Sequence, residues 1–147
     1  MEGAKGMTDF SLKIVTPDGV RFDGLAQELV VRTTEGDMGI LAGHTNCVAA
    51  LGMGRATVII DGSYRYGACI GGMVSVVNGE VTLLPTTFEW AEHIDTKRAD
   101  ASEQRAKEIL SSKSSTSTDI KLAEARLKRA LIRKNVAQHT PKKKAEA

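Results

Sequence analysis

Hydrophobic and polar residues alternate with a period of two through the first two thirds of the chain. Between Phe10 and Ile14 every second side chain is apolar, which predicts a strand with one buried face. A turn signal, Thr16-Pro17-Asp18-Gly19, follows this strand. Short strands separated by turn signals favour a β-sandwich or barrel, and the others are expected at residues 20–22, 26–33, 40–42, 57–60, 64–66, 75–77 and 81–84.

Glycines mark the predicted turns. Asp61-Gly62 and Asn78-Gly79 are typical of type I′ hairpin turns, in which both central residues need a positive φ. Gly71-Gly72 predicts a bulge or a close approach of two backbones. The glycine-flanked residues 35–39 are predicted to form a loop before the short strand at 40–42.

The hydrophobic period changes to about 3.6 at residues 94–99, which predicts helices from there on. Asp95 is the expected N-cap of the first helix. The serine-rich residues 111–118 are expected to be a loop, with Thr118 as the next N-cap. Both apolar stripes are thin, so the two helices should form a labile antiparallel hairpin. The expected stripe of the second helix is Ile120, Ala123, Leu127, Ala130 and Leu131.

Composition changes this picture in one respect, the distribution of charge. Residues 1–94 carry a net charge of −5 and residues 95–147 a net charge of +7. The basic half is suited to an anionic partner, which includes the acidic half of its own chain. No apolar run is long enough for a membrane helix or a signal peptide, so we expect a cytosolic protein. Cys47 and Cys69 are then expected to be reduced thiols that serve as small apolar side chains.

Catalytic or metal chemistry finds no support in the sequence, so we predict no catalytic residue and no metal site. The histidines His44, His93 and His139 are scattered and form no triad or metal-ligand spacing. The segment Gly36-Asp37-Met38-Gly39 resembles a phosphate loop only superficially, because no helix is predicted after it.

Arginines are the main candidates for ligand binding. Arg126, Arg129 and Arg133 recur at helical spacing on one face of the second helix. If the hairpin folds back, Arg98 and Arg105 of the first helix can meet these arginines beside Asp95. Guanidinium groups bind phosphate through bidentate hydrogen bonds. The alternative is a solvated face or a docking surface for acidic partners. Nucleic acid is not a predicted partner, because no aromatic residues are interleaved with the basic helix.

Three stretches in this order and spacing closely resemble the epsilon subunit of bacterial F-type ATP synthase. They are Gly36-Asp37-Met38-Gly39-Ile40-Leu41-Ala42-Gly43-His44, Gly71-Gly72-Met73-Val74-Ser75-Val76 with Val81-Thr82-Leu83-Leu84, and Ile94-Asp95-Thr96-Lys97-Arg98-Ala99. The resemblance implies an α+β, mainly β fold, with an N-terminal β-sandwich of about ten strands and a C-terminal antiparallel two-helix hairpin. The expected boundaries are an extension at 1–7, the sandwich at 8–92, the regulatory hairpin at 93–136 and a disordered basic tail at 137–147.

The same resemblance implies a non-catalytic rotor subunit of the central stalk. In that family the sandwich binds the gamma subunit and the c-ring, and the hairpin is a switch. Folded beside the sandwich it is permissive; extended toward the alpha and beta subunits it inhibits ATP hydrolysis, here through the basic face of Arg126, Arg129 and Arg133. Such a chain lies at the cytoplasmic face of the cell membrane, peripherally and only through the complex. The alternative is a stand-alone nucleotide-sensing module without a rotor partner.

No cofactor is implied, although ATP is a regulatory ligand in some members. The residues that match their ATP-binding pattern are Glu89, Ile94, Asp95, Arg98, Ala99, Arg105, Arg129 and Arg133. Asp37 and His44 match positions that face the c-ring. Ala42 and Asn46-Cys47 replace a loop that more commonly contains proline, and Asp37 stands where glutamate is usual.

Overall fold

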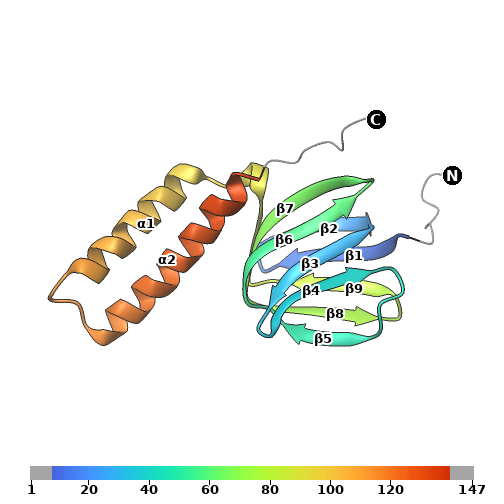
Figure 1. Cartoon of the computed structure of the whole chain (residues 1–147), viewed down its shortest axis with the longest axis horizontal. Helices are drawn as coiled ribbons and strands as arrows, with labels where there is room; N and C mark the ends of the chain where they lie inside the picture. Colours follow the sequence, from blue (N-terminus) through green and yellow to red (C-terminus); the bar gives the residue numbers. More distant parts are fainter. Residues whose placement is uncertain (1–7, 140–147) are drawn as a thin grey trace.

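A computed structural model describes residues 8–139 as two five-stranded sheets followed by two long helices (Figure 1). The first sheet has the order β2-β1-β9-β8-β5, formed by Gly19–Ala26, Phe10–Thr16, Glu80–Leu84, Met73–Val77 and Cys47–Ala50. The second has the order β10-β7-β6-β3-β4, formed by Thr87–Trp90, Ser63–Ile70, Met53–Ile60, Glu28–Thr33 and Gly36–Leu41. A single 3-10 turn, η1 (Ala91–His93), leads into α1 (Thr96–Ser111) and α2 (Ser117–Ala137). The predicted sandwich and helical hairpin are confirmed.

The core lies between the two sheets and follows the predicted alternation. Phe10, Leu12 and Ile14 of β1 are buried, whereas the residues between them face outward. Phe88 and Trp90 of β10 close the core beside the hairpin, with their rings edge to face at a centroid distance of 4.9 Å. Since the main core contains no residue of α1 or α2, the sandwich does not need the hairpin to be complete.

Both predicted type I′ turns are confirmed. The φ angles are 50° and 76° at Asp61 and Gly62, and 49° and 82° at Asn78 and Gly79. Gly71-Gly72 forms the expected close approach, because a Cβ at Gly72 would lie 2.0 Å from the carbonyl oxygen of Leu84.

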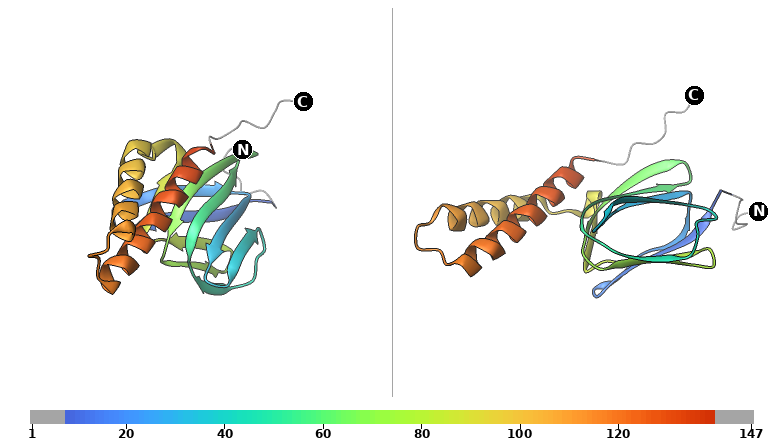
Figure 2. Two further views of the ribbon diagram at one scale, coloured as in Figure 1. Left: turned by 60° about the vertical axis from the view of Figure 1, so that its left-hand side comes forward. Right: turned by 60° about the horizontal axis from the view of Figure 1, so that its bottom comes forward.

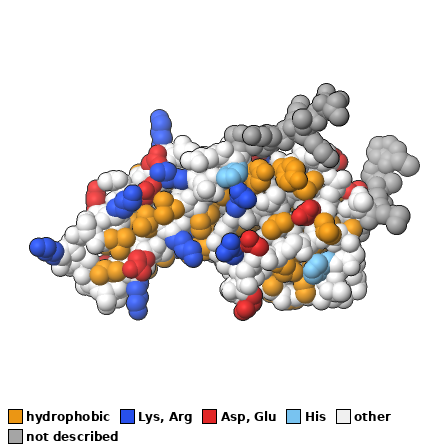
Figure 3. All heavy atoms as spheres, viewed as in Figure 1, with side chains coloured by type: hydrophobic (Ala, Val, Ile, Leu, Met, Phe, Trp, Pro, Cys, Tyr) orange, Lys and Arg blue, Asp and Glu red, His pale blue; other side chains and the backbone are white. Residues whose placement is uncertain are grey.

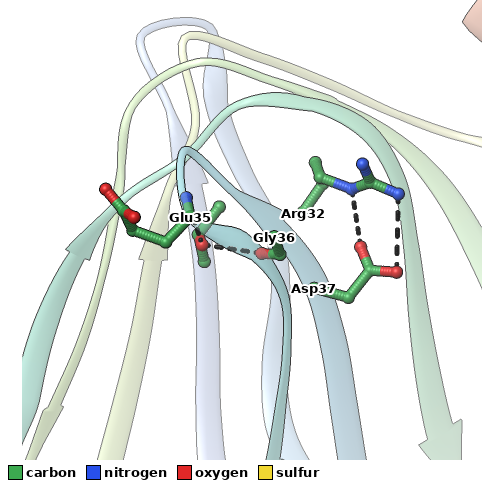
Figure 4. Close-up of polar contacts among 5 residues, drawn as sticks. Arg32, Glu35, Gly36 and Asp37 are labelled. Atoms are coloured by element: carbon green, nitrogen blue, oxygen red, sulfur yellow. Dashed lines mark hydrogen bonds and ion pairs between the residues drawn. The ribbon is translucent and has the colours of Figure 1, made fainter.

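The prediction of a loop at residues 35–39 is wrong, because strand β4 begins at Gly36 (Figure 4). A tight turn at residues 34–35 reverses the chain, and the Thr33 hydroxyl donates to the Gly36 carbonyl oxygen at 2.6 Å. Gly36 supplies the positive φ of 117° that this turn requires. The glycines of this segment therefore mark a β-hairpin rather than a loop. Arg32 and Asp37 are paired across the hairpin, and Arg32 Nε lies 2.6 Å from Asp37 Oδ1.

The helix starts were predicted with mixed success. Asp95 is the N-cap of α1, as expected, and its Oδ1 accepts from the backbone N–H of Arg98 at 3.1 Å. The N-cap of α2 is Thr116 rather than Thr118, because Thr116 forms a reciprocal capping box with Asp119.

Small residues line the interface between the helices. Ala99 and Ala106 of α1 are buried, as are Ala123 and Ala130 of α2. The expected apolar stripe of α2 is only partly correct, because Ile120 and Leu131 are 37% and 47% exposed. Alanine side chains let the helices approach closely but bury little apolar area, so this interface is a weak one.

Only one end of the hairpin contacts the sandwich (Figures 1 and 2). Val136 is buried there in a small apolar cluster with Ala68 and Ala91, and Ile94 packs against its edge. Just beyond α2, the His139 ring lies 5.3 Å from that of Tyr66.

The predicted disordered tail begins too early. Residues 137–139 are ordered, because α2 continues to Ala137 and His139 accepts a hydrogen bond from Arg55 Nη1 at 2.8 Å. The predicted extension at 1–7 and the rest of the predicted tail, residues 140–147, lie outside the described residues.

Charged side chains hold the two helices together beside the alanines. Lys134 Nζ lies 2.7 Å from Glu103 and 3.0 Å from Asp100, and Lys107 also pairs with Glu103 at 2.7 Å. Hydrogen bonds from Lys107 and Lys134 lower the pKa of Glu103 from 4.5 to about 2. The hydrogen bond with Glu103 in turn raises the pKa of Lys134.

Because the Glu103 pKa is lowered in the folded hairpin, its contribution to stability is complete above about pH 4.5 and is lost as the pH falls toward 2. We expect Glu103→Gln to make the hairpin amides exchange faster near neutral pH and to have a much smaller effect at pH 2. Hydrogen exchange of α1 and α2 measures this. Glu124→Gln is the control, because it removes an exposed carboxylate of α2 that forms no ion pair with the described residues. An equal effect of both variants would contradict the prediction.

Candidate functional site

A cavity of about 610 Å³ lies between the hairpin and the edge of the sandwich. Its volume is within the range of small-molecule sites, about 300–1,000 Å³. Basic side chains are prominent on the hairpin and at its junction with the sandwich (Figure 3). Residues from β2, β10, η1, α1 and α2 all contribute to the wall, so the cavity depends on the folded position of the hairpin.

The topology explains how these distant segments meet. Strands β2 and β10 are edge strands of different sheets, and both line the cavity. The chain leaves β10 through η1 and enters α1, which places Asp95 and Arg98 at this edge. Because α2 returns antiparallel to α1, Arg126, Arg129 and Arg133 come to face the same space.

The cavity has an excess of positive charge. Six arginines line it, but only three carboxylates, those of Asp18, Glu89 and Asp95. Arg133 Nε is paired with Glu89 at 2.7 Å. Between residues 8 and 139 the structure provides no ion pair for the four other hairpin arginines, which are Arg98, Arg105, Arg126 and Arg129. Guanidinium groups that outnumber the carboxylates around them form a site for an anion, and phosphate suits their geometry.

Most of the residues proposed from the sequence come together here. Seven of the eight ATP-binding candidates line the cavity, and they are Glu89, Asp95, Arg98, Ala99, Arg105, Arg129 and Arg133. Ile94 does not line it but packs against the apolar cluster that joins hairpin to sandwich. Arg126 is not among those eight, but helical spacing placed it on the same face as Arg129 and Arg133, and it lines the cavity as well.

Sequence reasoning found Glu89 of β10 but missed three other charged or titratable residues of the cavity wall. Asp18, Arg21 and His93 line the cavity but lie outside the helical pattern that drew attention to the arginines. The packing of the two sheets brings the edge strand β2 beside β10 and η1, and no spacing rule along the chain could have indicated it.

The candidate c-ring residues lie elsewhere. Asp37 is exposed near the start of β4, and His44 follows the end of that strand, with Nδ1 2.8 Å from the Thr45 carbonyl oxygen. At about 3.3 Å per residue, four residues of β4 place the Cα atoms of Asp37 and Leu41 about 13 Å apart. The two candidates therefore lie toward opposite ends of one edge strand rather than in one cluster.

Other site types find no support within residues 8–139. No group of three metal-ligating side chains occurs there, and no helix in that range is long and apolar enough to cross a membrane. Both cysteines are free thiols, and burial raises the pKa of Cys69 to about 12. Cys69 is therefore protonated at neutral pH, and its side chain packs in the core.

Comparisons with known proteins agree with this architecture. The family described as "ATP synthase, Delta/Epsilon chain, beta-sandwich domain" matches residues 9–91, and its "long alpha-helix domain" matches residues 92–138. The chain is 39% identical to the ATP synthase epsilon chain of Ruminococcus albus, over 89% of this chain and 98% of that one. It is 40% identical to the ATP synthase epsilon chain of Bacillus licheniformis, over 90% of this chain and 100% of that one.

Its fold is also similar to that of a chain in the structure of Euglena gracilis mitochondrial ATP synthase, OSCP/F1/c-ring. The TM-score is 0.76 at 22% identity, over 95% of this chain and 86% of that one. Both parts of the fold and nearly the full length of its bacterial relatives are thus matched. The chain belongs to the delta/epsilon chain family of the ATP synthases, with the bacterial epsilon chains among its relatives.

Proposed function

We propose that this chain is a non-catalytic subunit of the ATP synthase rotor that couples the c-ring to the gamma subunit. In this proposal its hairpin inhibits ATP hydrolysis when extended, and bound ATP holds it folded. The names of the relatives support the assignment to an ATP synthase, and one structure with this fold is titled as central stalk and c-ring of the Tetrahymena thermophila enzyme.

The cavity is the observation that carries the ATP part of this proposal. It combines four hairpin arginines that form no ion pair with residues 8–139 and carboxylates that can accept hydrogen bonds from a ribose or a base. The site exists only while the hairpin is folded, so ATP stabilises that state alone. Such a ligand contributes about 1–3 kcal/mol at concentrations 10- to 100-fold above its dissociation constant.

The switch part is supported by the weakness of the folded state. The two helices meet mainly through alanines, and the hairpin docks on the sandwich through one small apolar cluster, one ion pair and the contacts of His139. A segment with so few buried contacts opens at low free-energy cost. Two packings of similar free energy are the requirement for a switch that a ligand can bias.

The same arginines have roles in both states of this switch. Arg126, Arg129 and Arg133 line the cavity in the folded state, and an extended α2 presents them to acidic surfaces of the alpha and beta subunits. ATP and the catalytic subunits therefore compete for one basic face.

We further propose that the sandwich rests on the c-ring through its β3–β4 edge, where Asp37 and His44 lie. Asp37 is already paired with Arg32, and both side chains are more than half exposed (Figure 4). Because both side chains are exposed, a basic group of a partner could bind Asp37 and an acidic group could bind Arg32, each in competition with this ion pair.

Titration of ATP into the full chain, followed by calorimetry, tests the regulatory site. We expect saturable binding that favours ATP over ADP. Arg98→Ala should weaken it at least tenfold, on the order of 1.4 kcal/mol, because one guanidinium of the cavity is lost. Lys121→Ala is the matched control, since it removes the same charge from α2 outside the cavity. Equal loss in both variants would indicate general electrostatics, and unchanged binding by Arg98→Ala would remove the site.

A further inference from the structure

Arg21 of the sandwich faces the same cavity as the arginines of the hairpin. Its position is set by contacts with β10, the neighbouring edge strand of the other sheet. The indole N–H of Trp90 donates to the Arg21 carbonyl oxygen at 3.0 Å, and Arg21 Nε donates to the Phe88 carbonyl oxygen at 3.4 Å. The backbone and the stem of this side chain are therefore anchored at the cavity wall.

The outer part of the Arg21 guanidinium is not satisfied by the protein. Its two Nη groups have no acceptor among residues 8–139, although the residue is partly buried. Glu89, which lines the same cavity, is paired with Arg133 instead. A partly buried guanidinium with free donors has a clear preference for a ligand that supplies acceptors.

Charge is distributed unevenly along the cavity. At the sandwich end three carboxylates, those of Asp18, Glu89 and Asp95, offset Arg21, Arg98 and Arg133. Toward the hairpin loop the wall holds Arg105, Arg126 and Arg129 without any carboxylate. The α1 wall runs from Arg98 to Ile109, about 16 Å at 1.5 Å per residue, which suits an elongated ligand. A triphosphate is favoured at the loop end, and the base and ribose are left for the sandwich end.

We infer that Arg21 is a ligand-binding residue of this site, where it contacts the base and ribose end of the nucleotide. The inference rests on the proposed binding of ATP. Its consequence is that ATP bridges the two parts of the chain, because one end of the ligand binds the sandwich while the phosphates bind the hairpin. Bound ATP thereby adds to the few direct contacts that dock the hairpin.

Calorimetric titration of three full-length variants tests the role of Arg21. Arg21→Ala should weaken ATP binding about tenfold. Arg21→Lys should have an intermediate effect on ATP affinity, because an ammonium keeps the charge but cannot form the bidentate hydrogen bonds of a guanidinium. Lys13→Ala, which removes an exposed cation from the adjacent strand β1, should leave the affinity unchanged. Tripolyphosphate, which lacks base and ribose, should bind wild type and Arg21→Ala alike.

Hydrogen exchange tests the bridge itself. ATP should slow amide exchange at residues 19–22 of β2 as well as in α1 and α2, and Arg21→Ala should abolish the slowing in β2 only. Protection confined to the helices, unchanged ATP affinity of Arg21→Ala, or equally weakened tripolyphosphate binding would each overturn the inference.

The outcomes also separate this inference from the function on which it rests. If ATP binds the wild type and depends on Arg98 but not on Arg21, the inference fails and the regulatory site stands. If the wild type binds no ATP at millimolar concentration, both fail together.

Discussion

Removal of residues 95–147 is expected to abolish inhibition of ATP hydrolysis and to leave a folded sandwich that still binds gamma. The core of the sandwich includes no hairpin residue, so this deletion opens no cavity within it. Among the described residues, the apolar cluster that the sandwich loses is the small one in which Val136 covers Ala68 and Ala91. The proposed inhibitory surface, in contrast, is removed completely, because Arg126, Arg129 and Arg133 all lie in the deleted segment.

Hydrolysis by the reconstituted complex and co-purification with gamma measure the two parts of this prediction. Deletion of residues 140–147 alone is the control, and it should keep inhibition because both helices remain. Inhibition that survives removal of residues 95–147 would exclude the hairpin as the switch. A folded truncated chain that no longer binds gamma would instead favour a stand-alone nucleotide-sensing module.

Gly72→Ala is expected to destabilise the sandwich strongly. A Cβ at this position would lie 2.0 Å from the Leu84 carbonyl oxygen and 2.7 Å from the Pro85 Cα, and backbone atoms cannot rotate away as a side chain does. The φ of 93° adds strain for any residue with a Cβ. We expect a loss of about 3 kcal/mol or more, a large share of the 5–15 kcal/mol typical of a domain.

Urea unfolding of the full chain measures this loss. Gly62→Ala provides a matched control, because its φ is also positive at 76° but a Cβ there would meet nothing within 4 Å. That variant should lose only about 1–2 kcal/mol, the usual cost of a left-handed conformation. Similar losses in both variants would show that backbone strain alone, and not the close approach to Leu84, determines the loss of stability in Gly72→Ala.

The sandwich and the hairpin differ in the contacts that stabilise them. The sandwich is held by a continuous core, so its shape is insensitive to ligands. The hairpin is held by alanines, a few ion pairs and one small cluster, so modest free energies can move it. The proposed function, a rotor subunit with a movable regulatory hairpin, needs both properties.

Much of the fold could be predicted because its signals are local. Alternation in β1 predicted which side chains are buried, since a strand turns successive residues to opposite faces. Asp61-Gly62 and Asn78-Gly79 predicted their turns, because few other residues adopt positive φ at both positions. Asp95 predicted the start of α1, since a cap depends only on residues within one turn.

The errors arose where a local signal had two meanings. Glycines at residues 36 and 39 are compatible with a loop or with a strand that follows a tight turn, and pairing with β3 decided for the strand. Thr116 and Thr118 are both good N-caps, but only Thr116 has Asp119 in position for a capping box. Ile120 and Leu131 fit a helical stripe, yet the facing helix covers the alanines instead.

The tertiary structure decided only part of the cavity's lining. Helical spacing and an antiparallel return were enough to predict that Arg98, Arg105, Arg126, Arg129 and Arg133 would converge, because those distances depend on two neighbouring helices. Arg21 and Asp18 could not be predicted in this way. They reach the cavity because β2 and β10, far apart in sequence, are the edges at which two sheets meet beside the hairpin. The sequence by itself determined many of the strands, the turns and the basic face, whereas the packing of the two sheets decided which residues of the sandwich lie opposite that face.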